Sequence, residues 1–145
     1  MTSDLNRINA MHGRAKYEPG IIAELATNDP LKVLSLELVG KVDRYLDYSV
    51  TIRSGDFSGK SRFTVMKSSL KEFAENLSFS RGSEIYDTDS VGYIKVVGPD
   101  HLGHVAVDAR VGGDLDNYAR VQFNTDQTAL PDFTSGLFEF LRIVW

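Results

Sequence analysis

Two neighbouring segments of this chain alternate apolar and polar residues with a period of two. The apolar positions are Leu46, Tyr48, Val50 and Ile52 in the first segment and Phe63 and Val65 in the second. Such alternation is typical of β-strands that bury one face and leave the other in water. Gly55 and Gly59 lie between the segments and suit the turn or a bulge of a hairpin. The pattern therefore predicts two antiparallel strands of a sheet that has one apolar face.

The link between these segments contains a near-match to a nucleotide-binding motif. From Ser54 it has the sequence SGDFSGKS, one residue short of G-x-x-x-x-G-K-[ST]. The motif works only when a helix follows at once, because the N-terminal amides of that helix hold the phosphates. Here a second strand follows Ser61, and Ser54 replaces the glycine on which the tight turn depends. We interpret the match as accidental and expect no nucleotide binding.

A helical spacing appears next in the chain. The apolar residues recur at i, i+3, i+4 and i+7, at Leu70, Phe73, Ala74 and Leu77. This spacing predicts an amphipathic helix near residues 68–78, with the stripe facing the core. Ser69 and Glu72 have the spacing of a capping box, so we expect Ser69 to begin the helix.

The rest of the chain continues the alternating pattern and ends in a second helix. Strands are predicted at residues 31–39, 83–88, 91–97, 103–111 and 118–125. Short turns rich in Gly and Asp connect the last four of these strands, which is typical of antiparallel neighbours. The closing helix is expected near residues 130–144, with an apolar face formed by Phe133, Leu137, Phe140, Leu141 and Val144.

The predicted order of elements is three strands, a helix, four strands and a second helix. This order is typical of the α+β class, in which helices cover the apolar face of a mainly antiparallel sheet. We therefore expect one antiparallel sheet of six to seven strands with the middle and C-terminal helices packed on it. In this interpretation residues 31–145 form a single domain, and residues 1–30 form an N-terminal extension with room for one short helix.

Composition excludes several classes of site. The 145 residues include no cysteine, which rules out disulfides, thiolate metal sites and a cysteine nucleophile. No apolar run approaches the ~18 residues that a membrane span requires. The N-terminal segment also lacks the continuous apolar stretch of a signal peptide. We expect a soluble cytoplasmic protein without a membrane partner.

The net charge of −4 is unevenly distributed along the chain. Residues 1–81 carry 12 Lys and Arg against 10 Asp and Glu, whereas residues 82–145 carry 4 against 10. No basic stripe is present that would neutralise phosphates, which argues against direct nucleic-acid binding. The acidic half is explained either by a solvated surface or by electrostatic steering toward a basic protein partner.

The strongest catalytic candidate is the segment PDHLGHVAVD, which contains Asp100, His101, His104 and Asp108. On a strand that rises about 3.3 Å per residue, His104 and Asp108 share a face but lie roughly 13 Å apart, too far to bind one ion. A partly exposed strand histidine is the simpler interpretation. We therefore expect no catalytic residue, no metal and no cofactor, and we expect that the protein is not an enzyme.

Several segments carry a resemblance to a known bacterial family. Residues 123–133 follow the pattern F-x-T-D-Q-T-x-L-x-x-F, formed by Phe123, Thr125, Asp126, Gln127, Thr128, Leu130 and Phe133. A Gly-His-Val strand precedes this pattern, and an early hairpin with FSG in its turn leads into the helix LKEFAENL. Across residues 31–142 the chain resembles immunity proteins of the WapI type. The resemblance implies a non-catalytic protein that is encoded beside a polymorphic or contact-dependent toxin and blocks it.

Within that pattern, Asp126 and Thr128 suit the end of a strand and the start of the following helix, where side-chain oxygens accept hydrogen bonds from free N–H groups. We therefore expect a structural role for them.

The acidic residues of the C-terminal half concentrate in turns. Asp87 and Asp89 flank one turn, and Asp114 and Asp116 lie in another. Because carboxylates in turns on a rigid sheet suit recognition of a basic toxin surface, we predict these four as partner-binding residues. Acids retained for solubility are the alternative. For the function, the alternative is a small-molecule binding module or an enzyme with an unrecognised site.

Overall fold

The computed structural model describes residues 15–16, 22–112 and 117–143. The strands of this part form two antiparallel sheets. Sheet A contains five strands, β1 (Ala15–Lys16), β2 (Ile22–Ala26), β3 (Lys32–Val42), β4 (Tyr45–Ser54) and β5 (Phe57–Met66). Sheet B contains four, β6 (Ser83–Tyr86), β7 (Tyr93–Val97), β8 (His104–Val111) and β9 (Ala119–Asp126). The α+β class and the antiparallel pairing are confirmed, whereas the prediction of one sheet with six to seven strands is wrong.

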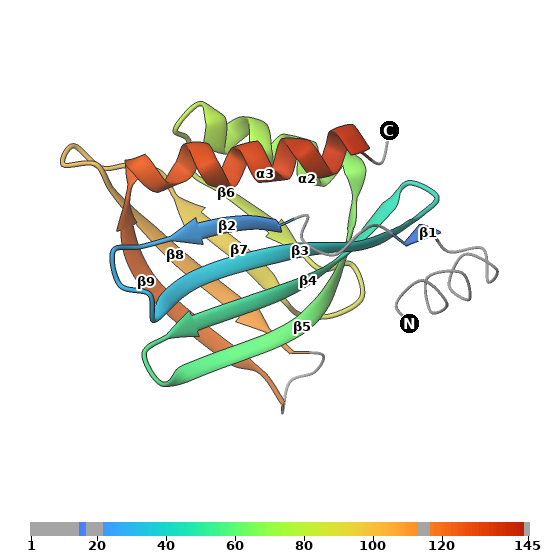
Figure 1. Ribbon diagram of the computed structural model, residues 1–145, viewed down its shortest axis with the longest axis horizontal. Helices are drawn as coiled ribbons and strands as arrows, with labels where there is room; N and C mark the ends of the chain where they lie inside the picture. The colour runs from blue at the N-terminus through green and yellow to red at the C-terminus, as the bar shows by residue number, and fades with distance from the viewer. Residues whose placement is uncertain (1–14, 17–21, 113–116, 144–145) are drawn as a thin grey trace.

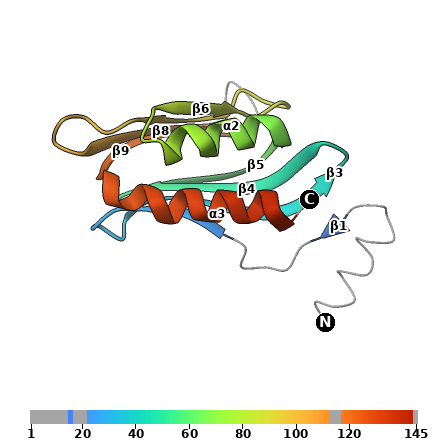
Figure 2. The same cartoon turned by 90° about the horizontal axis from the view of Figure 1, so that it is seen from above.

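Two helices lie side by side over the space between the sheets (Figure 1, Figure 2). Helix α2 (Lys67–Ser78) follows β5 and contacts β6, whereas α3 (Leu130–Ile143) contacts β2. A short 3-10 helix, η1 (Gln127–Ala129), connects β9 to α3. No helix of the described residues is long and apolar enough to cross a membrane.

The apolar faces of both sheets and both helices form a single core. Tyr48 of β4 lies at its centre, with ring centroids 6.0 Å from Phe63 of β5 and 6.4 Å from Phe140 of α3. Phe73 of α2 meets Phe133 of α3 edge-on at 6.3 Å. Each sheet has only one apolar face, so facing the two sheets across this core removes both faces from water.

The close approach of the two sheets explains why residue 59, near the predicted turn, is a glycine. The turn itself consists of Gly55 and Asp56, because Ser54 and Phe57 are paired. Gly59 lies inside β5, where a Cβ atom would come 2.6 Å from Val111 and 2.8 Å from Ala119 of sheet B. The last glycine of the apparent nucleotide-binding motif is therefore a contact point between the sheets, which supports the interpretation of that match as accidental.

The expected boundary at residue 30 does not match the described structure. Residues 22–26 form β2, a strand paired with β3, and Ala23 and Leu25 on this strand are buried. Gly136 of α3 lies against Ala23, because a Cβ atom at that glycine would come 2.7 Å from the Ala23 Cα. This part of the predicted extension thus belongs to sheet A. The sequence pattern did not predict the strand because it contributes only two buried side chains.

The helix termini confirm one prediction and correct another. Helix α2 begins at Lys67 without a side-chain cap, and the backbone N–H of Lys67 donates to the carbonyl of Arg44 at 2.9 Å. Ser69 therefore does not begin the helix. At the end of β9, the Asp126 carboxylate accepts from the backbone N–H of Thr128 at 2.8 Å and from its hydroxyl, so the structural role of these two residues is confirmed.

The predicted apolar faces of the two helices are largely confirmed. Leu70, Phe73, Ala74 and Leu77 of α2 are buried, as are Phe133, Leu137 and Phe140 of α3, whereas Leu141 is only partly buried. Val144, also predicted on this face, lies outside the described residues. We expect Leu137→Ala to lower the free energy of unfolding by about 2–5 kcal/mol, because it leaves a cavity in the core. Phe138→Ala, on the exposed side of α3, should change it by about 0.5 kcal/mol or less. Urea denaturation measures both, and equal losses would contradict the docking of α3.

The contact at Gly59 gives a second prediction. Gly59→Ala should destabilise the protein by about 1–3 kcal/mol, because the added methyl group overpacks the junction of the two sheets. Lys60→Ala is the matched control at the neighbouring, exposed position, with an expected change within about 0.5 kcal/mol. An unchanged stability of Gly59→Ala would show that the sheets separate at this point without cost.

Candidate interaction surface

The outward side chains of sheet B form a continuous surface of aromatic and charged groups. Along each strand they alternate with buried residues such as Ile85, Val96 and Val107. The surface consists of Glu84, Tyr86, Tyr93, Lys95, Val97, His104, Ala106, Asp108, Arg110, Arg120, Gln122, Asn124 and Asp126, together with Tyr118, whose ring contacts Arg110. We call it the outer face of sheet B.

Two tyrosines and a lysine form one cluster on this face. Tyr86 of β6 and Tyr93 of β7 are directly opposite each other, with ring centroids 6.2 Å apart. The Lys95 Nζ lies 4.6 Å from the Tyr93 centroid and 5.9 Å from that of Tyr86. Cation–π attraction therefore holds the lysine against both rings. The cluster presents exposed aromatic surface, since Tyr86 is 49% exposed.

A second cluster is centred on Asp108. Its carboxylate accepts two hydrogen bonds from Arg120, from Nε at 3.0 Å and from Nη2 at 2.8 Å. Weaker bonds come from the Tyr93 hydroxyl at 3.3 Å and the Gln122 side-chain amide at 3.4 Å. The hydrogen bond from Arg120 lowers the pKa of Asp108 below its ordinary value. Partial burial and the neighbouring Asp108 carboxylate raise the pKa of Tyr93, which stays a neutral donor.

A third contact pairs Arg110 of β8 with Tyr118, the residue before β9. The Arg110 Cζ lies 3.8 Å from the centroid of the Tyr118 ring, which is 51% exposed. Arginine stacks well on aromatic faces and keeps its outer N–H groups available to a ligand. Aromatic and arginine side chains are therefore held in fixed positions across the whole width of sheet B.

A small residue interrupts this face and leaves a depression. Ala106 of β8 lies between Val97 on β7 and Asn124 on β9. The hollow beside it has a volume of about 400 Å³ and is also lined by Asp108 and Gln122. An exposed apolar side chain, Val97, stands at its rim. The face thus combines projecting rings with a recess, which suits an interlocking contact with a protein.

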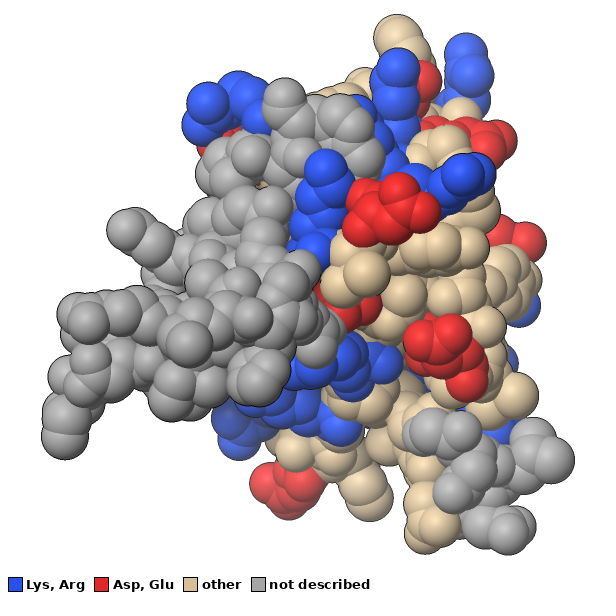
Figure 3. Space-filling view, turned by 90° about the vertical axis from the view of Figure 1, so that its right-hand side faces the viewer, with Lys and Arg blue, Asp and Glu red and all other residues tan. Residues whose placement is uncertain are grey.

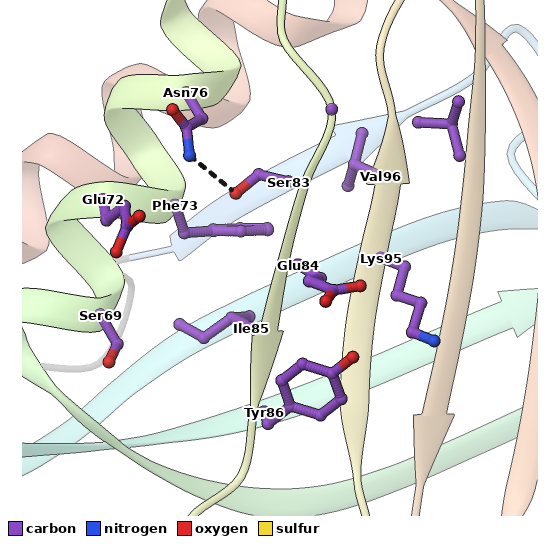
Figure 4. Close-up of a pocket in the computed structure, with 12 residues that line it drawn as sticks. Ser69, Glu72, Phe73, Asn76, Ser83, Glu84, Ile85, Tyr86, Lys95 and Val96 are labelled. Atoms are coloured by element: carbon purple, nitrogen blue, oxygen red, sulfur yellow. Dashed lines mark hydrogen bonds between the residues drawn. The ribbon is translucent and has the colours of Figure 1, made fainter.

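A larger groove, about 660 Å³, separates α2 from β6 (Figure 4). Ser69, Glu72 and Asn76 project from α2 toward β6 in this view. The Asn76 side-chain amide donates to the Ser83 hydroxyl at 3.4 Å across one end of the groove. Phe73 and Ile85 line its inner side, where the core begins. The groove therefore has polar walls above an apolar base.

The four acids predicted to bind a partner do not share one environment in the structure. Asp87 is only 7% exposed, and its carboxylate accepts from the backbone N–H of Thr64 at 3.0 Å, from that of Asp89 at 3.1 Å and from the Ser90 hydroxyl. Asp87 therefore fixes its turn against β5 and is not available as a surface contact. Asp89 is exposed. Asp114 and Asp116 lie outside the described residues.

The candidate segment at residues 99–108 also has a structural explanation. The Asp100 carboxylate accepts from the backbone N–H groups of Leu102 at 2.8 Å and His104 at 2.9 Å, and it lies 3.4 Å from His104 Nδ1. These bonds lower the pKa of Asp100. His104 is exposed at the start of its strand, as predicted, and Asp108 is paired with Arg120 instead. Within the described part of the chain, no group of three or more potential ligands could hold a metal ion.

Charges of both signs are interspersed on the end of the molecule that carries the β3–β4 hairpin (Figure 3). The uneven charge along the sequence therefore does not appear as an acidic zone on this view.

The aromatic and basic members of the outer face were not among the predicted site residues. Their signal was present in the sequence, because Tyr86, Tyr93 and Lys95 occupy the polar side of two predicted strands. Grouping them needs the register that pairs residue 86 with residue 93. The sequence pattern predicts the strands without fixing that register.

Asp87 offers a direct test of its structural role. Asp87→Ala should lower the free energy of unfolding by about 2–4 kcal/mol, because it leaves buried donors without their acceptor. Asp89→Ala, at the exposed end of the same turn, should change it by about 0.5 kcal/mol or less. Chemical denaturation of both variants measures the difference. An equally small change in the free energy of unfolding for both variants would contradict the structural role of Asp87.

No protein-family model matches this chain, and no curated protein matches it.

Proposed function

We propose that this chain is a non-catalytic protein-binding domain that neutralises a toxin protein, as an immunity protein does. The observation that supports this most directly is the outer face of sheet B. Tyrosine and arginine are the residues that most often dominate the energy of protein interfaces. Here they are held in place by neighbouring side chains before any partner arrives, so little conformational entropy is lost on binding.

The charge of the outer face favours a protein partner over nucleic acid. Lys95, Arg110 and Arg120 contribute positive charge, while Glu84 and Asp108 offset most of it. Arg120 is moreover occupied by Asp108 through two hydrogen bonds. A phosphate backbone requires several unneutralised cations. Balanced charges around exposed rings are instead typical of protein recognition.

The identity of the partner as a toxin rests on the resemblance of residues 31–142 to immunity proteins of the WapI type. In this proposal the protein acts in the bacterial cytoplasm, where it meets the toxin, and it uses no cofactor. The acidic turns retain a separate proposed role. Asp89, Asp114 and Asp116 would increase the rate of association with a toxin that has a basic surface, because opposite charges steer the encounter.

The experiment expresses this chain together with the toxin domain encoded by the adjacent reading frame. Growth should be rescued by the unchanged protein. Replacing both Tyr86 and Tyr118 by alanine should weaken binding of the purified toxin domain by about tenfold or more, because two exposed rings are lost. Phe57→Ala removes a ring that is 78% exposed on the hairpin of sheet A and serves as the matched control.

Three results separate the possibilities. Loss of affinity in the tyrosine variant alone supports the outer face of sheet B. A second result is unchanged affinity in the tyrosine variant together with slower association of a variant in which Asp89, Asp114 and Asp116 are all changed to lysine. This result would assign the contact to the acidic turns. If the unchanged chain neither binds the toxin domain nor rescues growth, the proposed immunity function is wrong.

A further inference from the structure

One edge of strand β6 makes no backbone pairing with another described strand. β6 is the first strand of sheet B and, within the part of the chain that the structure describes, pairs only with β7. The backbone N–H of Asp87 donates to the carbonyl of Gly92 at 3.0 Å, and these residues continue the register in which Ile85 faces Ile94. Hydrogen-bonded and non-bonded pairs alternate along antiparallel strands. Ser83 and Ile85 therefore bond to β7, whereas the N–H and C=O groups of Glu84 and Tyr86 point away from it.

These outward groups face the groove beside α2. No hydrogen bond from another described residue reaches the backbone of Glu84 or Tyr86 from that side. The edge of sheet A at β5 differs, because Thr88 donates its backbone N–H to the carbonyl of Thr64 at 2.9 Å, and Thr64 donates to Asp87. Proteins commonly cover exposed strand edges, since these edges template pairing with another chain. At β6 the edge opens instead into a space of about 660 Å³.

The lining of this space suits an extended chain. An added strand lies ~4.8 Å from its neighbour, with alternate side chains on opposite faces. Phe73 and Ile85 provide an apolar base for side chains that point inward. Helix α2 forms the far wall, so a bound segment would be enclosed between a helix and a strand.

The charges of the groove indicate which segment it accepts. Glu72 lines it from α2 and Glu84 from β6, and both side chains are exposed. Lys95 also belongs to the lining, but its ammonium group is held over the rings of Tyr93 and Tyr86. The carboxylates of the groove are therefore available to a cation brought by the ligand.

We propose that β6 binds an extended, basic peptide segment of a partner protein as an additional strand of sheet B. The main-chain groups of Glu84 and Tyr86 would hold the peptide backbone. Glu72 and Glu84 would select lysine or arginine side chains on it. This binding mode, β-strand addition, takes its affinity from backbone hydrogen bonds and its specificity from alternate side chains. The site does not depend on whether the partner of the outer face is a toxin.

The probe is a synthetic peptide, acetyl-Thr-Lys-Val-Lys-Val-Thr-amide, added to the full chain labelled with nitrogen-15. Saturable shifts should appear at the amides of Glu84 and Tyr86, and exchange of these amides with solvent should slow by about tenfold or more as they become hydrogen-bonded. The matched peptide with glutamate in place of lysine should bind more weakly, by about tenfold at least, because like charges then meet in the groove.

Two variants separate the main-chain contact from the charge. Glu84→Pro removes an N–H that makes no bond to β7, so proline is compatible with this edge position. Glu84→Thr removes the same carboxylate and keeps the N–H. The lysine peptide should therefore bind more weakly to the proline variant than to the threonine variant. If the proline variant fails to fold, Glu72→Lys gives an independent test, because it should reverse the preference between the two peptides.

Several outcomes would overturn the proposal. One is the lack of saturable shifts with either peptide at millimolar concentration. Another is binding that leaves the exchange of Glu84 and Tyr86 amides unchanged, or that is equal in the proline and threonine variants. Slow exchange of these amides without peptide, together with a concentration-dependent dimer in sedimentation, would show that β6 pairs with a second copy of the chain instead.

Discussion

The burial of two one-sided sheets against each other is the constraint on which the rest of this structure depends. Each sheet presents a row of aliphatic and aromatic side chains on one face only, and these faces share one core. Facing sheets leave an open side, and α2 and α3 fill it with Phe73 and Phe133 in edge-on contact. Burial of this kind is the dominant favourable term in folding. It also leaves the second face of sheet B in water, free for recognition.

Polar groups at the margins of this core fix how the sheets meet. Thr64 of β5 donates its backbone N–H to the Asp87 carboxylate and its hydroxyl to Asp47 at 2.8 Å. A buried carboxylate is costly unless it accepts such bonds, which explains why Asp87 has so many donors. The Tyr48 hydroxyl is buried without a partner among the described residues, and burial raises the pKa of Tyr48. Satisfied polar groups thus lie at the rim, whereas the centre is held by packing.

Local patterns in the sequence predicted the elements, but the features that depend on long-range pairing were not predictable from them. The stripe from Leu70 to Leu77 and the cap at Asp126 are set within one or two turns of chain, so spacing alone reveals them. The division into two sheets depends on which strands pair, and period-two alternation does not contain that information. Gly59 illustrates the same limit: its role is defined by Val111 and Ala119, about fifty residues or more away in sequence. The outer face of sheet B was unpredictable for the same reason, because its members come together only through the register of the strands.

Strand β6 shows how one short element can serve two surfaces. The side chains of Glu84 and Tyr86 stand on the outer face, perpendicular to the sheet, while the backbone groups of the same residues point within its plane toward the groove. A ligand that rests on the Tyr86 ring and a strand that pairs with these backbone groups therefore use different atoms and do not exclude each other. A partner that carries both elements would bind the second one intramolecularly, so that its effective concentration, and not a new contact, strengthens the complex. The unpaired edge is consequently most useful to a partner that already rests on the tyrosines beside it.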